Sequence, residues 1–406
     1  MRIVDVCAFY SPQGGGVKTY IERKMRAAPQ LGHELVVVAP GERDEVVEVA
    51  PGALLHTIPA PFMPLDRRYH YFDDEAALHA ALDRWKPDHI EASSPWSSAS
   101  MVARYPGPAT RSLVMHSDPL ASYAYRWFGP VVSQKRIDHW FDWFWRHLRS
   151  LDRRFDVVVT PNRDLERRLR AGGLEKVTSV PFGVDSELFS PSLRAPDLRA
   201  DWLARLGLGA DATLLLSVGR FGAEKRWPMV LKAAAAAGKR VPAGLVLVGD
   251  GPHAPKLERI ASRLPHVTVA PPIKDRLSLA TLMASADALV HGCESETFCL
   301  VASEAKASGL PLIVPDRGGA FAQLDEATGY AYASGDRKAL AEAIEHFAVR
   351  RSGIPARADQ ARASVTPIRT MDQHFVELFA LYLIGLPFGG QVGDLVTSIG
   401  SAVGIG

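Results

Sequence analysis

The sequence predicts an α/β protein with two domains, each built on a parallel β-sheet. Short runs rich in β-branched residues alternate with helical stretches, which is the pattern of successive βαβ units. The alternation begins afresh near Ala212, after a segment rich in proline and charge. A chain of 406 residues that is 47% hydrophobic can bury one or two sizeable cores, and two domains are the natural division.

The runs place the strands in two series. In the first series we expect strands at Arg2–Phe9, Leu35–Ala39, Leu54–Ile58, His89–Ala92, Ser112–His116, Val157–Thr160 and Thr178–Pro181. In the second series we expect Leu214–Val218, Gly244–Val248, Val267–Ala270, Ala288–His291 and Leu312–Val314. Glycine, proline or polar turn residues follow these runs. The sequence therefore predicts one Rossmann-like domain over residues 1–188 and another over residues 189–368, with a cleft between them and a linker plus short helix over 189–212.

Composition and charge exclude several classes of protein. The formal net charge of +2 is close to neutral, so no nucleic-acid partner is expected. Cys7, Cys293 and Cys299 are too few and too irregularly spaced for a disulfide framework or a zinc site, which favours a reducing compartment. The first residues do not form a cleavable signal, and no apolar run reaches eighteen residues. We expect a cytoplasmic protein that is soluble or peripheral on the inner face of the membrane.

Two glutamates in the second domain are the leading functional candidates. Glu296 and Glu304 stand eight residues apart, one just before a predicted helix that opens near Leu300 and one about a turn inside it. A loop and helix start at the carboxyl end of a strand is where open α/β sheets bind phosphorylated ligands. The alternative is an ordinary amphipathic helix with solvated glutamates.

Two basic residues follow the first strand of the second domain. Residues 217–226 read SVGRFGAEKR, in which Gly219 lets the chain turn sharply and Arg220 and Lys225 leave the edge of the sheet. Two cations without a metal can stabilise a diphosphate leaving group, on whose bridging oxygen charge develops as a glycosidic bond breaks. Taken alone, such a pair is more often two solvated basic residues on a loop.

Together these motifs resemble those of the family 4 retaining glycosyltransferases of GT-B fold. The stretch ETFCLVASEAKASGLP is similar to the E-x7-E signature of that family. The resemblance implies that Glu296 meets the hydroxyls of the donor sugar, that Glu304 binds the nucleotide ribose, and that Arg220 and Lys225 hold the pyrophosphate. It implies no cofactor and no metal. Many members of the family have glycine where this chain has Cys299, which bears on the backbone approach to the sugar.

The resemblance extends to further residues of the donor site. A glycine-rich loop after the first strand reaches the donor phosphate in this family, and backbone groups around Pro272–Lys274 bind the nucleobase, leaving guanine and uracil as alternatives. The implied donor contacts are Gly15, Gly16, Gly219, Gly249, Asp250, Ile273, Lys274, Ser295, Thr297, Phe298, Cys299, Leu300 and Glu304. His116 is implied to line the sugar pocket, although a histidine at a strand end is more often structural. The departing phosphate, not a side chain, is expected to take the proton of the acceptor.

The acceptor or a membrane is expected to contact an aromatic and basic segment of the first domain. On a helical wheel, a stripe of apolar residues predicts core, while Trp143 falls outside it beside Arg136. The stripe consists of Ile137, Trp140, Phe141, Phe144, Leu148 and Leu151. Tyr123 and Tyr125 complete the candidate acceptor contacts. Aromatic residues beside basic ones are typical of an interfacial helix, but a solvated helix over an aromatic core explains them as well. Resemblance to enzymes that glycosylate bacterial glycolipids favours a peripheral membrane enzyme with an anionic surface as partner.

The C-terminal part of the chain divides at about residue 388. In the family resembled, a helix corresponding to residues 369–387 returns to the first domain. The tail 388–406 is rich in glycine and has little to pack.

The sequence therefore predicts a retaining hexosyltransferase that uses a nucleotide diphosphate sugar, GDP-mannose or a UDP-hexose, and a lipid or carbohydrate acceptor. A GT-B epimerase and a non-catalytic sugar-nucleotide-binding protein remain alternatives. A nicotinamide-dependent oxidoreductase is disfavoured because no G-x-G-x-x-G follows a strand.

Overall fold

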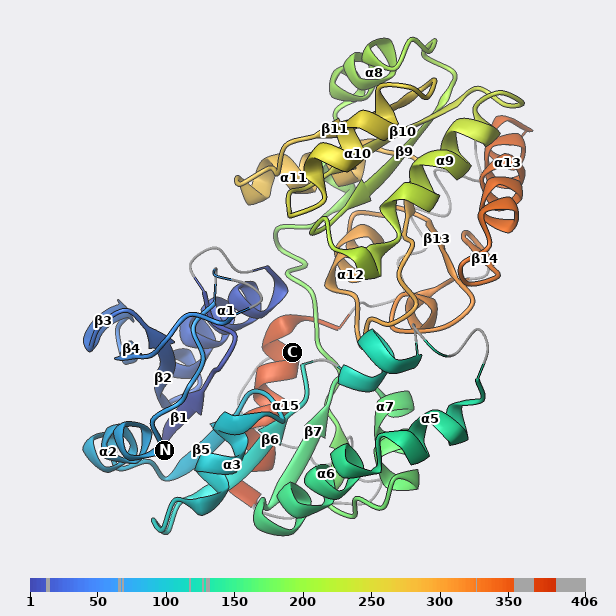
Figure 1. Ribbon diagram of the computed structural model, residues 1–406. Coiled ribbons are helices and arrows are strands. Elements are labelled where there is room, and N and C mark those ends of the chain that lie inside the picture. Colours follow the sequence, from blue (N-terminus) through green and yellow to red (C-terminus); the bar gives the residue numbers. More distant parts are fainter. Residues whose placement is uncertain are drawn as a thin grey trace. The chain divides into compact units, whose positions relative to one another are not determined.

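The computed structural model describes residues 1–11, 15–64, 67, 69–116, 118–125, 128, 132–325, 327–353 and 369–384, without the side chains of 122, 123, 352, 353 and 384. The chain forms two compact units (Figure 1): unit 1 contains residues 1–182 and 371–406, and unit 2 contains residues 183–370. Among the described helices, none combines the length and apolar character needed to cross a bilayer.

Unit 1 is built on an eight-stranded sheet of order β3-β4-β2-β1-β5-β6-β7-β8. Its strands are β1 Arg2–Val6, β2 Glu34–Gly41, β3 Glu45–Ala50, β4 Ala53–Pro59, β5 His89–Ala92, β6 Thr110–Val114, β7 Val157–Thr160 and β8 Val177–Ser179. Its helices are α1 Gly16–Gln30, α2 Glu75–Trp85, α3 Ser97–Arg104, the π-helical turn η1 Leu120–Tyr125, α5 Gln134–Trp140, α6 Asp142–Arg154, α7 Arg163–Ala171 and α15 Met371–Ile384. Every pairing is parallel except that of β3 with β4.

A buried ionic cluster connects the first strand of unit 1 with its last helix. Lys24 on α1 contacts Asp5 at 2.9 Å and also pairs with Glu91, and all three side chains are fully buried. Burial lowers the pKa of Lys24, but the two carboxylates outweigh that effect and the pKa is raised overall. The hydroxyl of Tyr382 on α15 donates to Glu91 at 2.6 Å. Helix α15 therefore packs within unit 1, beside α1, although about 190 residues of unit 2 precede it.

Unit 2 is built on a six-stranded parallel sheet of order β11-β10-β9-β12-β13-β14. Its strands are β9 Thr213–Val218, β10 Ala243–Val248, β11 Val267–Ala270, β12 Ala288–Val290, β13 Leu312–Pro315 and β14 Tyr330–Tyr332. Its helices are α8 Pro196–Arg205, α9 Trp227–Ala237, α10 Ala254–Ala261, α11 Arg276–Ser285, α12 Leu300–Ala307 and α13 Arg337–Gly353, with 3₁₀ turns η2 Pro191–Leu193, η3 Ala223–Lys225 and η4 Phe321–Gln323.

Alternating residues of the central strands of unit 2 fill two separate cores. Leu215 and Leu245 point to one face of the sheet, whereas Leu214, Leu216 and Val246 point to the other. Because the side chains of a strand alternate between faces, both faces of this parallel sheet are buried, which agrees with the mostly apolar sequences of its strands. Phe189 and Leu203, from the segment expected to hold a linker and short helix, pack in the second of these cores.

The helical wheel of the aromatic segment is wrong at Trp140. Ile137, Phe144 and Leu148 are buried as expected, but Trp140 is 50% exposed. The cause is a break between α5 and α6 at Phe141, where ψ is 23° and the helical register changes. Trp145, which lies off the expected stripe, takes a buried position instead.

Candidate functional site

The candidate site lies at the carboxyl edge of the unit 2 sheet. Since all six strands are parallel, the loops that follow β9, β10, β11 and β12 leave the sheet at one edge. These loops contain most of the residues assigned to the donor, from Gly219 to Leu300, the first residue of α12.

The loops after β9 and β10 approach each other backbone to backbone. The amide of Phe221 donates to the carbonyl of Asp250 at 2.7 Å. A Cβ on Gly249 would lie 2.0 Å from the carbonyl oxygen of Gly219, so only glycine fits there. Asp250 accepts a bond of 2.7 Å from the amide of Gly251. The glycines therefore shape the edge of the sheet through close packing, and Asp250 stabilises its own turn.

The two basic residues of the β9 loop occupy different surroundings. Lys225 forms an ion pair with Glu296, and their side chains are only 16% and 20% exposed. Arg220 pairs with Glu224 at 3.0 Å and is 45% exposed. The structure thus joins Lys225 with the first glutamate of the motif, whereas Arg220 carries its charge at the surface of the same loop. The indole N–H of Trp227 donates to the carbonyl of Arg220 at 2.9 Å and fixes the backbone there.

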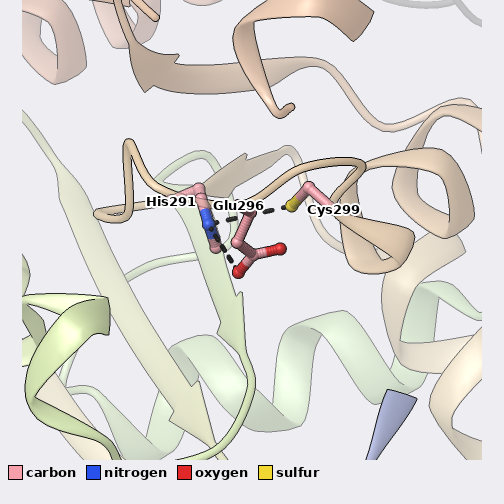
Figure 2. A group of neighbouring side chains, drawn as sticks. All are labelled: His291, Glu296 and Cys299. Atoms are coloured by element: carbon pink, nitrogen blue, oxygen red, sulfur yellow. Dashed lines mark hydrogen bonds and ion pairs between the residues drawn. The ribbon is translucent and has the colours of Figure 1, made fainter. Parts of the chain in front are cut away.

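Glu296 also lies against a histidine and a cysteine (Figure 2). His291 directly follows β12, and its Nε2 lies 3.2 Å from Oε1 of Glu296 and 3.7 Å from Sγ of Cys299. Burial, with the charge of Lys225 adding to it, lowers the pKa of His291 well below its usual value. Burial raises the pKa of the Cys299 thiol to about 12. Both groups are therefore neutral at physiological pH, beside a charged Lys225–Glu296 pair.

Cys299 adopts a left-handed backbone conformation with φ of 66° immediately before α12. Such a conformation costs about 1 kcal/mol or more for a residue other than glycine. The carbonyls of Phe298 and Cys299 both accept bonds from the side-chain amide of Gln323, which holds the turn in place. Position 299 therefore suits the glycine that is common in the family this sequence resembles, whereas this chain has a cysteine there.

The second glutamate of the motif lies inside α12. Glu304 pairs with Arg276 of α11 at 3.0 Å and is 12% exposed. Burial raises the pKa of Glu304, although the charge of Arg276 opposes it. The guanidinium of Arg276 also lies 4.9 Å from the ring centroid of Phe189. Glu304 is thus held in one place by a cation.

The remaining donor candidates of unit 2 lie around these groups. Ser295 contacts the thiol of Cys293 at 3.2 Å. The amide of Gly319 donates to the carbonyl of Glu296 at 2.7 Å, and a Cβ there would meet the backbone of Thr297 and Phe298 at 2.6 Å. Ile273 is half-buried and Lys274 is exposed in the loop after β11.

Sequence reasoning missed several members of the site. They are Arg226, His291, Glu294, Arg276 and Gln323. Arg226 and Glu294 form a further ion pair, with Nε and Oε2 2.9 Å apart. His291 ends a strand, which is a signal of a site position in a parallel sheet. Arg276 carries no such signal, because its contact depends on how α11 and α12 pack.

The first candidates of unit 1 lie at the start of α1 and after β6. Gly15 caps α1 and Gly16 begins it, and both are exposed. His116 follows β6 and is half-buried, with its ring 4.9 Å from that of Tyr20. Burial lowers the pKa of His116 to about 4, although the charge of Asp5 opposes it.

The acceptor candidates are divided between interior and surface. Tyr125 donates to Asp138 and lies under the guanidinium of Arg168 at 4.8 Å, so it supports the interior. Trp143 is 55% exposed and Arg136 is exposed. The side chain of Tyr123 lies outside the described part of the structure, as do residues 385–406, which include the expected tail.

Comparisons with known proteins agree on the type of protein. A family profile described as "Glycosyl transferases group 1" matches residues 199–361, and one described as "Glycosyltransferase Family 4" matches residues 14–188. The chain is 30% identical to the GDP-mannose-dependent α-(1-6)-phosphatidylinositol dimannoside mannosyltransferase of Mycobacterium tuberculosis, over 90% of this chain and 92% of that protein. It is also 30% identical to a GDP-mannose-dependent α-mannosyltransferase of Mycobacterium tuberculosis, over 79% of this chain and 80% of that protein. Its fold resembles that of sucrose-phosphate synthase from Thermosynechococcus elongatus, with a TM-score of 0.71 and 21% identity over 95% of this chain and 99% of the other.

Proposed function

Because the chain belongs to the family 4 glycosyltransferases, we propose that it transfers mannose from GDP-mannose to a hydroxyl group of a membrane glycolipid. Described without a specific donor or acceptor, this activity is that of a retaining hexosyltransferase that uses a nucleotide diphosphate sugar. Two relatives that each cover more than three quarters of this chain are named as GDP-mannose-dependent. One of them is named for a phosphatidylinositol dimannoside acceptor. These names support the mannosyl donor and the lipid acceptor proposed for this chain.

The observation that carries the proposal is the Lys225–Glu296 ion pair at the carboxyl edge of the unit 2 sheet. In the absence of donor, each charge satisfies the other. A bound diphosphate offers Lys225 a stronger anionic partner, and this exchange releases Glu296 to accept hydrogen bonds from the hydroxyls of the sugar. Lys225 and Glu296 therefore contact the diphosphate and the sugar, the two groups that the breaking bond joins.

Leaving-group stabilisation is the main catalytic task proposed for this edge. As the glycosidic bond breaks, negative charge builds on the diphosphate oxygen, and the cation of Lys225 stabilises it. Arg220, which pairs with Glu224 at the surface, is close enough to Lys225 in sequence to turn to the same diphosphate. The departing phosphate then takes the proton of the acceptor hydroxyl. No metal is required for these steps.

The nucleoside end of the donor is assigned to Glu304. Its carboxylate, fixed by Arg276, accepts hydrogen bonds from the ribose hydroxyls. A rigid acceptor costs little conformational entropy when the ligand binds. The backbone of the loop containing Ile273 and Lys274 is proposed to contact the base.

A membrane surface is proposed as a partner of unit 1. Trp140 and Trp143 are 50% and 55% exposed, and Phe128 is 36% exposed. Aromatic side chains near basic ones such as Arg136 suit a headgroup region. We therefore place the enzyme at the cytoplasmic face of an anionic membrane, held there peripherally.

Vesicle flotation tests the membrane part of the proposal. Wild type should bind vesicles that contain anionic lipid at low salt and should dissociate as salt rises. Loss of Arg136 removes roughly 1 kcal/mol of attraction, so Arg136→Ala should bind about fivefold more weakly, and Trp143→Ala should also bind more weakly. Leu277→Ala, which changes a 52% exposed side chain in unit 2, is the control. Equal recovery of all four proteins at low salt would refute the assignment of this surface.

Transfer of radiolabelled mannose tests the proposed function itself. Purified enzyme should move label from GDP-mannose into phosphatidylinositol mannosides in detergent micelles. UDP-glucose and ADP-glucose should give far less product. Transfer from UDP-glucose alone would overturn the donor assignment, and transfer only to a soluble sugar would overturn the acceptor assignment.

A further inference from the structure

His291, Glu296 and Cys299 place three potential metal ligands around one point (Figure 2). One ligand atom of each residue lies within 4.8 Å of the other two. The imidazole nitrogen lies 3.2 Å from the carboxylate oxygen and 3.7 Å from the sulfur. The histidine and cysteine are buried, and the glutamate is partly exposed.

The nitrogen–oxygen and nitrogen–sulfur separations match those around a tetrahedral zinc ion, and the carboxylate oxygen lies within 4.8 Å of the sulfur. With zinc at about 2.0–2.1 Å from nitrogen or oxygen and 2.3 Å from sulfur, tetrahedral angles place nitrogen about 3.4 Å from oxygen and about 3.6 Å from sulfur. We propose that these three side chains form a Zn²⁺ site, in which the ion acts as an inhibitor and not as a cofactor. Cysteine spacing alone gives no sign of this site, because a single cysteine contributes to it.

Hydrogen bonds hold the backbone of His291 and Cys299 in place. The amide of His291 donates to Ile313 at 2.9 Å, and its carbonyl accepts a 2.8 Å bond from the hydroxyl of Tyr332. The carbonyl of Cys299 accepts bonds from Ala302 at 2.9 Å and from Gln323 at 3.2 Å. The backbone that carries these two ligands is therefore held in place.

The donor set selects the metal. Sulfur and imidazole nitrogen are preferred by Zn²⁺, whereas Mg²⁺ and Ca²⁺ prefer oxygen ligands. Three protein ligands leave the fourth tetrahedral position to water. The partly exposed Glu296 provides the side from which the ion reaches the buried pair.

Zinc and Lys225 compete for the same atom. The ammonium group of Lys225 and the imidazole of His291 both contact Oε1 of Glu296. When Zn²⁺ binds, the thiol of Cys299 gives its proton to solvent, the Zn–S bond forms, and Lys225 leaves Glu296. Inhibition follows because Glu296 is then unavailable to the sugar. This consequence rests on the proposed function, whereas binding of the metal does not.

Cobalt substitution tests the site without any measurement of transfer. Co²⁺ added to the full-length protein should give one saturable equivalent with thiolate-to-cobalt charge-transfer absorption, and one equivalent of Zn²⁺ should displace it. Cys299→Ala should lose this absorption. Cys7→Ala and Cys293→Ala, which each remove another buried cysteine, should keep it. Absorption that survives in Cys299→Ala, or that never appears in the wild type, would overturn the site.

Two further variants keep the test decisive if Cys299→Ala does not fold. Glu296→Gln should weaken Co²⁺ binding while preserving the sulfur-derived band. Lys225→Met removes the competing cation and should tighten Zn²⁺ binding by at least about tenfold, since it leaves the largely desolvated carboxylate of Glu296 without its partner. Unchanged metal affinity in both variants would show that Zn²⁺ and Lys225 do not compete for Glu296. Addition of 10 mM Mg²⁺ should leave the cobalt spectrum unaltered, and a change would contradict the assignment to zinc.

An activity measurement separates the two proposals. If Zn²⁺ slows mannosyl transfer and a chelator restores it, both proposals stand together. If Co²⁺ binds as described but Zn²⁺ does not change transfer, the inhibitory role is wrong while the metal site stands. If no nucleotide sugar is used at all, the proposed function fails, and the cobalt spectra still decide the site.

Discussion

Replacement of Lys225 by methionine is the most informative perturbation of this protein. Methionine keeps most of the apolar stem and removes the charge. In the folded protein Lys225 and Glu296 are 16% and 20% exposed, so the variant leaves Glu296 charged and largely desolvated. A fully buried pair would lose about 3–5 kcal/mol in this way. Because water still reaches both groups, we expect a loss of about 2 kcal/mol in the free energy of unfolding.

The Lys225→Met substitution should lower both the melting temperature and the turnover. For a unit of this size, 2 kcal/mol corresponds to a fall of roughly 4–8 °C in Tm by differential scanning calorimetry. Turnover should fall at least tenfold, or about 1.4 kcal/mol in the barrier, because the diphosphate loses its cation. The double variant Lys225→Met/Glu296→Gln should melt above Lys225→Met, since neither charge remains buried alone.

A matched lysine elsewhere provides the control. Lys338 is 87% exposed and lies 3.6 Å from Glu342 one helical turn away. Lys338→Met should change stability by about 0.5 kcal/mol or less and should leave turnover unaltered. Wild-type turnover in Lys225→Met, with or without a change in Tm, would refute the assignment of Lys225 to the leaving group.

Three further perturbations separate catalysis, nucleotide binding and stability. Arg220→Ala should lower turnover at least tenfold in steady-state assays while Tm shifts little, because Arg220 is 45% exposed; unchanged turnover would remove it from the diphosphate site. Glu304→Ala should weaken GDP binding by about ten- to a hundredfold in calorimetric titrations, as expected for a lost charged hydrogen bond, and equal affinity would exclude the ribose role. His89 tests the pH dependence of stability, because burial lowers its pKa to about 3. Below pH 6.5 the unfolded imidazole is protonated while the folded one stays neutral, so stability falls with pH by up to about 1.4 kcal/mol per unit until about pH 3. His89→Gln should show a shallower fall in urea denaturation series, and an identical slope would show that the histidine does not titrate in this way.

The strands of both sheets were predictable where they are buried on both faces. The runs ending in Val218 and Val248 are mostly apolar and buried, and glycines follow them. The edge strand β3 was not predicted, because it is mostly exposed and pairs only with β4. A strand that buries little carries little hydrophobic signal.

The candidate site was predictable where its residues belong to one local motif. Glu296 and Glu304 stand close in sequence at the start of one helix, so a single stretch revealed them. Arg276 was missed because its contact with Glu304 arises from the packing of two helices. Trp140 was expected in the core because the sequence predicts one continuous helix, whereas the helix breaks at Phe141 without a glycine or proline to mark the break.

The central claim is that this chain moves mannose from GDP-mannose with retention of configuration. Proton NMR of the complete reaction, containing enzyme, GDP-α-mannose and a phosphatidylinositol mannoside acceptor, tests it most directly. We predict that the anomeric signal of the donor disappears, that GDP forms, and that an equal amount of α-linked mannoside appears. A β-linked product, or GDP-mannose that remains intact while another nucleotide sugar is consumed, would contradict the claim.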